Sequence, residues 1–373
     1  DVDYNTERNS AMLVQQTILE DWLSQLFTVA GCPGEEARLI AIHLVDADAS
    51  GHPSHGIVRV PRYMDYIKQQ KVRPVCAYTT LMSSGSLRLF DGQYSFGQVL
   101  GHHVVREACE IVQSEGLALI GLRHAGHLGR IGGWAELLAD QGLISLHFVN
   151  VAGSRIVAPF GGREAQLSTA PIAIGVPRFL DSGESDHFIL DFATSRVAEG
   201  KILVSLKTGT PLPPDAMVDE TGADSDHPVT IYGETATSGV PNPRGGTGAI
   251  QTFGEHKGSG LGLACELLAG ALTGSGTNAH ERPFCNGMLS IVFDPAKFDQ
   301  GNGMRREIED FVTSIRNSAP RHQDQPVLMP GDPERTRRRA AKMNGIELGQ
   351  SICNQLIEIS TELGVAIPNP LGG

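Results

Sequence analysis

The sequence predicts an α/β fold with helices at both ends of the chain and a strand-rich block between them. Apolar residues recur at helical spacing near the amino terminus and again beyond residue 350. From about residue 80, short apolar runs bounded by glycine, proline and aspartate are typical of strands. We therefore expect the two chain ends to share one helical subdomain.

The helices follow from apolar spacing and from the residues that interrupt it. Ile18, Trp22 and Leu26 lie four residues apart within 11–30, and Gly31 ends that pattern. The break at 52–60 precedes a third helix that runs through Tyr66. Further helices are expected over 35–51, 99–114, 134–141, 260–272 (a buried one) and 352–364.

Six apolar runs are expected to be strands, and the glycine-rich and proline-rich stretch 206–248 is predicted to be mostly loop. The runs are LRLFDG (87–92), ALIGLRH (118–124), ISLHFVNVAG (144–153), APIAIGVP (170–177), HFILDFATS (187–195) and NGMLSIVFDP (286–295).

Composition excludes several classes of protein. The 373 residues are enough for about two or three domains. The net charge of −12 disfavours a general nucleic-acid binder, which needs a basic surface. No run of 18 apolar residues predicts a membrane span. The six cysteines form no CxxC pair, which favours reduced thiols in a cytoplasmic protein.

The common nucleotide-binding motifs are absent. The closest approach to GxGxxG begins at Gly258 and Gly260 but has Leu263 where the third glycine belongs. The sequence also lacks GxxxxGK[ST], HExxH and GxSxG. If this chain binds a dinucleotide, the usual Rossmann phosphate turn is not the means.

The tripeptide Ser54-His55-Gly56 and the following Arg59 suit acid/base chemistry on a carboxylic acid. If Gly56 opens the third helix, His55 and Arg59 lie about one turn apart and face one pocket. A histidine exchanges protons near pH 7, and an arginine fork binds a carboxylate. The alternative is a histidine that caps a helix and an arginine in a surface ion pair.

Three other stretches have both a binding and a structural interpretation. HAGHLGRIGGWAE (124–136) is a glycine-rich strand-to-helix turn that can cradle a pyrophosphate together with Arg130, or merely connect two elements. Asp191–Ser195 can hydrogen-bond a cofactor or cap the next helix. The segment 255–258 (EHKG) can donate to an anion or form a solvated loop.

Six stretches, in order, resemble the malate/L-lactate dehydrogenases of the second type. The stretches are DADASGHPSHGIVRVPRY (46–63), GHLGRIGGWAE (126–136), VAPFGG (157–162), LDFATS (190–195), FGEHKGSGLGLACELLAGALTG (253–274) and MPGDPE (329–334). The wording of 126–136 and 144–153 is most similar to the hydroxycarboxylate dehydrogenase B branch of that family.

The resemblance implies an NAD- or NADP-dependent oxidoreductase of small 2-hydroxy and 2-keto acids that works as a homodimer, without membrane or nucleic-acid partners. Some relatives reduce cyclic imino acids. The implied fold is a non-Rossmann, mixed, largely antiparallel sheet with flanking helices. The expected parts are a helical subdomain (10–75 with 335–373), a substrate and dimer subdomain (76–125 with 296–334) and a cofactor-binding domain (126–295).

The resemblance also implies roles for individual residues. His55 would be the proton donor or acceptor, with Ser54 beside it, and Arg59 would hold the substrate carboxylate. His127 is the rival acid/base. Cofactor contacts are expected from His55, Gly129, Arg130, Ile131, Asp191, Phe192, Ala193, Thr194, Ser195, His256, Lys257, Asn286, Pro330, Gly331, Asp332 and Pro333. No bound metal is expected.

Two departures from the family pattern leave the substrate open, and two other classes of function compete. Gly126 stands where many members have asparagine, and Ala170 replaces the asparagine of Gly-Thr-Asn-Pro. A metal-dependent hydrolase would use the pairs His52/His55 and His124/His127, completed by Asp48 or Asp191. A non-catalytic metabolite-binding protein would keep only the fold.

Overall fold

The computed structural model describes residues 12–234, 244–299, 301 and 303–369. The chain divides into two compact units, Asp1–Cys76 with Asp332–Gly373 as the first and Ala77–Gly331 as the second. The finer three-part division expected from the sequence stays a prediction. Within the described residues, no helix is both long enough and apolar enough to cross a membrane.

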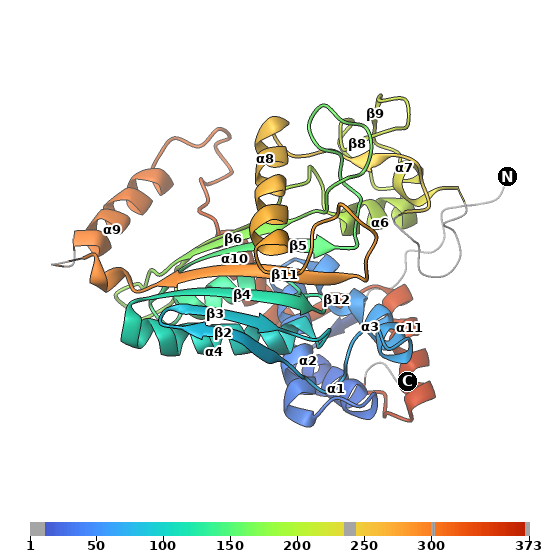
Figure 1. The fold of residues 1–373 in the computed structure, drawn as a ribbon, viewed down its shortest axis with the longest axis horizontal. Helices are drawn as coiled ribbons and strands as arrows, with labels where there is room; N and C mark the ends of the chain where they lie inside the picture. Colours follow the sequence, from blue (N-terminus) through green and yellow to red (C-terminus); the bar gives the residue numbers. More distant parts are fainter. Residues whose placement is uncertain (1–11, 235–243, 300, 302, 370–373) are drawn as a thin grey trace. The chain divides into compact units, whose positions relative to one another are not determined.

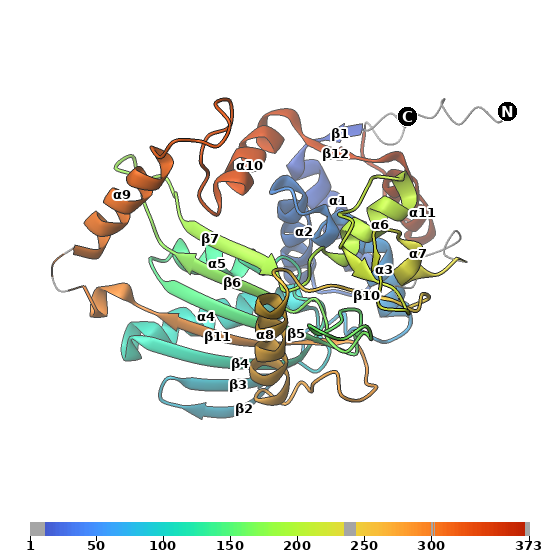
Figure 2. The same ribbon diagram turned by 90° about the horizontal axis from the view of Figure 1, so that it is seen from above.

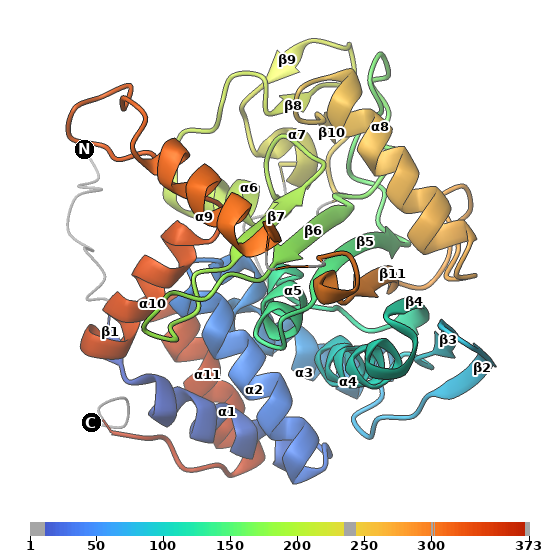
Figure 3. The ribbon, with the colours of Figure 1, turned by 90° about the vertical axis from the view of Figure 1, so that its left-hand side faces the viewer.

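The first unit consists mainly of helices and contains both ends of the described chain. Strand β1 (Met12–Val14) pairs antiparallel with β12 (Ile346–Leu348). Helices α1 (Gln16–Val29) and α11 (Gln350–Leu363) pack together, as Figure 3 shows, and the Trp22 indole donates to the Ser360 hydroxyl at 3.0 Å. Helix α2 (Gly34–Ala49) lies against α1 and against α10 (Asp332–Asn344).

The predicted break at 52–60, with a third helix after it, is confirmed. Two short 3-10 turns, Pro53–His55 and Ile57–Arg59, precede α3 (Val60–Lys68). The condition that Gly56 itself opens the third helix is not met. The Gly56 backbone is extended, with ψ −146°, and interrupts the turns on either side.

A seven-stranded sheet forms the centre of the second unit. Its order is β2-β3-β4-β11-β5-β6-β7, and every neighbouring pair is antiparallel except β3 and β4. The strands are β2 (Thr79–Ser84), β3 (Leu87–Asp91), β4 (Leu117–Ala125), β5 (Ile144–Ala152), β6 (Pro171–Val176), β7 (Phe188–Ala193) and β11 (Cys285–Phe293). All six predicted strands are present, and the mixed, mostly antiparallel sheet with flanking helices is confirmed.

Helices cover both faces of this sheet (Figure 1). Helices α4 (Gly97–Glu115) and α5 (Gly132–Ala139) pack on one face. On the other face, α8 (His256–Cys265) continues as a π-helix over Glu266–Ala271 and crosses β6, β5, β11 and β4 (Figure 2). This helix was predicted to be buried, but its outer face is open: Leu263, Leu267 and Leu272 are 48%, 62% and 63% exposed.

Several elements lack the pattern that would have predicted them. Strand β2 is exposed throughout, so it has no apolar alternation. Helices α6 (Glu199–Thr208) and α7 (Val229–Tyr232) and the short strands β8 (Met217–Val218), β9 (Asp224–Ser225) and β10 (Ala249–Ile250) lie in or beside the stretch predicted to be mostly loop. They enclose a separate core that includes Ile202, Met217 and Ile250.

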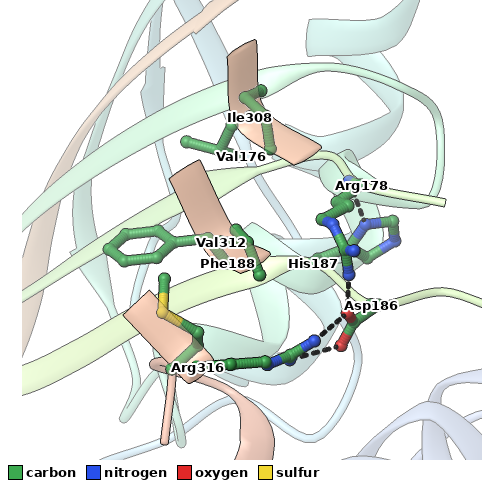
Figure 4. A pocket seen from close by; sticks show the side chains of 9 residues that line it. Val176, Arg178, Asp186, His187, Phe188, Ile308, Val312 and Arg316 are labelled. Carbon is green, nitrogen blue, oxygen red and sulfur yellow. Dashed lines mark hydrogen bonds and ion pairs between the residues drawn. The ribbon is translucent and has the colours of Figure 1, made fainter. Parts of the chain in front are cut away.

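Helix α9 (Gly303–Arg316), also unpredicted, rests on the β6–β7 hairpin through Ile308 and Val312 (Figure 4). Beside them, Arg178 and Arg316 hold the Asp186 carboxylate between them, with Arg316 Nη1 at 2.9 Å. The cavity enclosed there measures about 20 Å³, which is room for a water molecule but not for a substrate. We therefore place no active site under α9.

Helices α4 and α5 can cross closely only because position 101 of α4 is a glycine. A Cβ atom at Gly101 of α4 would lie 2.4 Å from the Trp134 ring of α5. Gly101→Ala should lower the free energy of unfolding by about 1–3 kcal/mol, because the buried ring has no space to move into. Denaturant titration measures this difference.

Gly260→Ala is the matched control for Gly101→Ala. Gly260 also lies within a helix, and a Cβ there would meet nothing within 4 Å. This variant should be neutral or up to about 1 kcal/mol more stable, because alanine favours helix more than glycine does. Equal effects of the two substitutions would contradict the packing argument.

Candidate active site

The antiparallel register gathers the chemically distinctive stretches at one edge of the sheet. Asn286 pairs with Ala125, Cys285 with Ala152, and Pro171 with Ala193. The ends of β4, β5 and β7 therefore lie beside the starts of β11 and β6. We call this the active-site edge, and it comprises residues 91–97, 124–131, 151–154, 168–171, 191–195 and 285–286.

Buried amide groups hold the glycine-rich loop after β4. Asn286 Oδ1 accepts the Leu128 amide at 2.9 Å, and its Nδ2 donates to the Asn150 carbonyl at 3.1 Å. The Trp134 indole donates to the Leu128 carbonyl at 3.2 Å. The Asn286 amide thus joins the loop to β5, and its contact with a cofactor stays a prediction.

At the other side of this loop, three non-glycine residues adopt left-handed backbone. They are Gln93, Tyr94 and His124, with φ of 48°, 61° and 50°. The Tyr94 amide donates to the His124 carbonyl at 2.7 Å, and the two rings stack 5.4 Å apart. Such strain is costly and gathers at functional sites. The strained trio therefore supports a functional role for this end of the active-site edge.

Asp91 organises the same corner, although no sequence motif pointed to it. It accepts from Arg123 Nε at 2.8 Å and from the Gln93 amide at 3.0 Å, and its Oδ2 lies 3.2 Å from His124 Nδ1. Burial favours the neutral carboxyl, but these hydrogen bonds outweigh it and hold the pKa of Asp91 below its ordinary value. Asp91 therefore stays ionised at neutral pH and orients the His124 ring.

The predicted cofactor residues after His127 are buried within the chain. Arg130 is 2% exposed, and its guanidinium pairs with Glu136. The Gly132 amide, at the start of α5, donates to Asp191 Oδ2 at 2.7 Å. Asp191 thus ties β7 to the start of α5, and Glu136 of the same helix holds Arg130. Direct contact of Gly129, Arg130 and Ile131 with a cofactor stays a prediction.

The hydroxyl groups that follow β7 are also engaged inside the chain. Thr194 Oγ1 donates to the Thr169 carbonyl at 3.1 Å, and Ser195 Oγ donates to the Val197 carbonyl at 2.8 Å. The ring of Phe192 packs edge-on against Phe253. These hydroxyl bonds do not cap the next helix, because α6 has Ala198 at its N-cap position without a side-chain capping bond, so the capping interpretation was wrong. Contact of 191–195 with a cofactor stays a prediction.

The start of α8 presents polar groups to solvent. His256 and Lys257 form its first turn and are exposed. A Cβ at Gly258 would lie 2.3 Å from the Phe253 carbonyl and 2.8 Å from the Thr194 carbonyl, so only glycine lets this turn approach the strand end. A helix amino terminus with two cationic or donor side chains suits a phosphate group.

A buried acid lies further along the same helix. Glu266, in the π-helical segment, accepts from the Asn278 amide at 2.9 Å and from Ser168 Oγ at 3.4 Å. Burial raises its pKa, and the bonds from Asn278 oppose that shift. Two residues after Ser168, Ala170 has φ 33° and no exposed surface. The asparagine common at that position would accept this backbone more readily.

In the first unit, the turn of Ser54, His55 and Arg59 is held by its own side chains. Arg59 Nε donates to the Ser54 carbonyl at 2.5 Å, and the His55 amide donates to the His52 carbonyl at 2.9 Å. The Ile57 amide donates to Asp48 Oδ2 at 2.6 Å. His55 and Arg59 thus belong to one hydrogen-bonded turn, although not to one helix.

The predicted residues 330–333 and His52 contact other parts of the chain. The Pro330 carbonyl accepts the Ile189 amide at 3.1 Å, and Gly331 turns the chain with φ 101°. Asp332 and Pro333 begin α10. His52 Nε2 lies 3.0 Å from Glu334 of the same helix.

The structure offers the metal-dependent alternative no support. Among the residues described, no group of three or more His, Cys, Asp or Glu side chains could hold a metal ion. His52 and His55 lie in the first unit, and His124 and His127 lie in the second.

Residues 14–357 match the family model described as malate/L-lactate dehydrogenase. The chain belongs to that family. Hydroxycarboxylate dehydrogenase B of Escherichia coli K12 is 32% identical over 93% of each chain. Malate/L-lactate dehydrogenase relatives thus match nearly the whole of this chain rather than one unit of it.

Solved structures of similar proteins support the same assignment. A structure described as a malate/lactate dehydrogenase from E. coli superposes with a TM-score of 0.86 at 32% identity, covering 96% of each chain. A Δ1-piperideine-2-carboxylate reductase from Pseudomonas syringae has a TM-score of 0.78 at 27% identity, covering 93% of this chain and 99% of its own. This chain therefore belongs to a dehydrogenase family whose relatives include 2-hydroxyacid oxidoreductases.

Removing the Asn286 side chain should loosen the active-site edge. Asn286→Ala leaves the Leu128 amide and the Asn150 carbonyl buried without this partner, which costs about 1–3 kcal/mol per group. Denaturant unfolding should show that loss, whereas Asn354→Ala, on the exposed face of α11, should change stability by less than about 0.5 kcal/mol. Similar losses in both variants would argue against the bridging role.

Proposed function

We propose that this chain catalyses reversible hydride transfer between a nicotinamide cofactor, NAD or NADP, and C2 of a small 2-hydroxy or 2-keto acid. The observation that carries the proposal is the held turn of Ser54, His55 and Arg59 in a chain of this family. When bound, the nicotinamide supplies or accepts the hydride. The protein must supply a proton, a grip on the carboxylate and a seat for the cofactor.

His55 is the proposed acid/base, and Arg59 the proposed carboxylate ligand. The Arg59 Nε atom is occupied by the Ser54 carbonyl, which orients the guanidinium so that its two terminal nitrogens form the fork for a carboxylate. Ser54 is thereby fixed beside His55. His127 remains the rival acid/base, and its position next to the anchored Leu128 supports that alternative.

The active-site edge fits a nucleotide. Gly129 has φ 74°, a backbone conformation that other residues avoid, in the buried turn after β4. His256 and Lys257 at the start of α8 are the exposed donors for phosphate charge. Because Arg130 is neutralised by Glu136, we assign phosphate binding to His256 and Lys257 before Arg130.

Reduction of a cyclic imino acid is a second candidate. Its support is the similarity to the Pseudomonas reductase and the alanine at position 170. A protonated imine, like a keto group, needs a carboxylate ligand beside the reacting carbon. The same residues would therefore serve, and the two candidates differ in substrate alone.

Purified protein should consume NADH or NADPH when given pooled 2-keto acids or cyclic imino acids, with a chelator present. His55→Ala should lower kcat about 10²–10⁴-fold, because proton transfer contributes that much. Arg59→Ala should raise KM for the acid about 10–100-fold, the equivalent of a lost charged hydrogen bond. Near-ultraviolet absorbance follows each reaction.

Arg38→Ala is the control, since Arg38 is 60% exposed on α2 and should leave both constants unchanged. Full turnover in His55→Ala together with none in His127→Ala would transfer the acid/base role to His127. Failure of every substrate pool and of nicotinamide binding would overturn the proposed function itself.

We also propose that the functional form is a homodimer that covers the outer face of α8. From Gly258 to Thr273 the sole charged residue is Glu266, which is buried. Leu263, Leu267 and Leu272 therefore form an uncharged, exposed apolar stripe. Such a stripe is typical of a protein interface.

Sedimentation should show a dimer of the wild-type chain that Leu267→Arg dissociates, because arginine would lose its hydration in the interface. Met343→Arg is the control: Met343 is 74% exposed on α10, outside the stripe, and should leave the dimer intact. A wild-type monomer, or a Leu267→Arg dimer of unchanged affinity, would contradict this interface.

A further inference from the structure

Asp48 occupies an unfavourable place in its helix. It lies in the last turn of α2, where the aligned peptide dipoles oppose a negative charge. Asp46 shares that turn but has a counter-charge, because Arg338 contacts its two oxygens at 2.7 and 2.8 Å. Asp48 instead accepts the Ile57 amide at 2.6 Å. This carboxyl group thus opposes the helix dipole while it holds a backbone amide of the turn that carries His55.

The contact with that turn is close enough to determine the residue next to Ile57. A Cβ atom at Gly56 would lie 2.0 Å from Asp48 Oδ2 and 2.5 Å from its Cγ. Only glycine lets the carboxyl group reach the backbone there. Gly56 and Asp48 therefore act together, although they are eight positions apart in the sequence: the glycine leaves the space that the carboxyl group occupies.

The bond from Ile57 lies between the two 3-10 turns. His55 ends the first turn and Arg59 ends the second, and Gly56 between them is extended. The Ile57 amide opens the second turn, where no carbonyl of that turn is available to it. Asp48 fixes this amide, and through it the angle between the two turns.

We propose that Asp48 is a positioning residue of the reaction, whose carboxyl group sets the relative places of His55 and Arg59 and changes its hold on them with protonation. This inference rests on the proposed function, in which those two side chains exchange the proton and bind the substrate carboxylate. Asp48 acts through the Ile57 amide and touches no reacting atom. A displacement of about 1 Å between catalytic groups can cost about 100-fold in rate.

The protonation state of Asp48 changes in the working range of pH. Burial raises its pKa to about 7, and the hydrogen bond from Ile57 opposes that shift. The ionised form accepts the amide more strongly than the neutral one. The hold on the turn therefore tightens as pH rises through about 7.

The charged groups around Asp48 have partners of their own. On α2, Asp46 pairs with Arg338 of α10. On the turns, His52 lies against Glu334 of α10, and Arg59 bonds the Ser54 carbonyl. Arg337 of α10 packs over Gly51, and His55 completes the set. The test must therefore change Asp48 alone and leave these neighbours intact.

Kinetics of Asp48→Ala, Asp48→Asn and the control Asp46→Asn provide the test, with NADH or NADPH and the accepted acid from pH 5.5 to 8.5. Asp48→Ala should lower kcat at least 10-fold and raise KM, since both His55 and Arg59 lose their places. Asp48→Asn should recover most of kcat, because an amide oxygen also accepts from Ile57. We expect kcat/KM of wild type and of Asp46→Asn to rise near pH 7, and that of Asp48→Asn to lack this rise.

Asp48→Ala with wild-type kcat and KM per folded molecule would overturn the proposal. So would an Asp48→Asn pH profile that superimposes on that of wild type, because the rise would then belong to a histidine.

Two readouts keep this test separate from the proposed function, since neither needs turnover. Hydrogen exchange of peptides covering 53–60 should quicken in Asp48→Ala and return toward the wild-type rate in Asp48→Asn. Stability gives the second readout. A raised folded pKa means that stability is fully present below about pH 4 and is lost as pH rises through about 7. The urea midpoint of Asp48→Asn, measured relative to that of wild type at the same pH, should therefore increase from pH 5 to pH 8.

Unchanged exchange over 53–60 in Asp48→Ala would overturn the positioning role even if no substrate is found. Conversely, wild-type protein without any nicotinamide-dependent activity, but with the expected exchange differences, would overturn the proposed function and leave Asp48 as the residue that orders the turn.

Discussion

The amide of Asn286 is the interaction on which the active-site edge depends. It bridges the loop after β4 to strand β5, and the ladder alone cannot hold that loop because Leu128 lies beyond the end of β4. A loop buried at Leu128 must satisfy its backbone groups with side chains, and the amide satisfies a donor and an acceptor together. Asn150 extends the bridge, since its Oδ1 accepts the Gly287 amide at 3.1 Å and its Nδ2 donates to the Gly276 carbonyl at 2.8 Å. The glycine-rich loop is consequently a rigid part of the sheet rather than a mobile connection.

The close approach of α8 to the sheet explains much of the glycine-rich composition of residues 253–274. The helix must approach the strand ends more closely than side chains allow, so Gly258 and Gly270 stand where a Cβ would strike Phe253 or Asn150. The outer side of the same helix has the opposite character, being apolar and exposed at Leu263 and Leu267. One helix therefore seals the inner face of the sheet and presents an uncharged surface on its outer side, which is why its composition looked like that of a buried helix.

The sequence predicted the sheet well because β4, β5, β6, β7 and β11 are apolar on at least one face and end at glycine, proline or aspartate. It did not predict β2, which is exposed on both faces, or α9, where Ile308 and Val312 face the β6–β7 hairpin while Phe311 is exposed. Four-residue spacing placed His55 and Arg59 at one pocket on the condition that Gly56 opens a helix, but Gly56 separates two 3-10 turns there, and such a local break leaves no periodic pattern. Asp91 was missed because its importance lies in contacts with Arg123 and His124, more than 30 residues away. Long-range pairing leaves no periodicity to detect.

Buried or misplaced charge marks each part of this site. Arg130 lies 2% exposed against Glu136, Glu266 is 5% exposed among amides, and Asp48 lies at the carboxyl end of α2. Each arrangement costs stability relative to apolar side chains of the same size. Local rules of helix capping and core packing would remove them, and natural sequences break such rules mainly where function requires it. Arg130 and Glu266 stabilise loops of the active-site edge, and Asp48 holds the turn of His55 and Arg59. Within each unit, therefore, buried or half-buried ionisable groups fix the backbone beside the residues to which we assign binding or proton transfer.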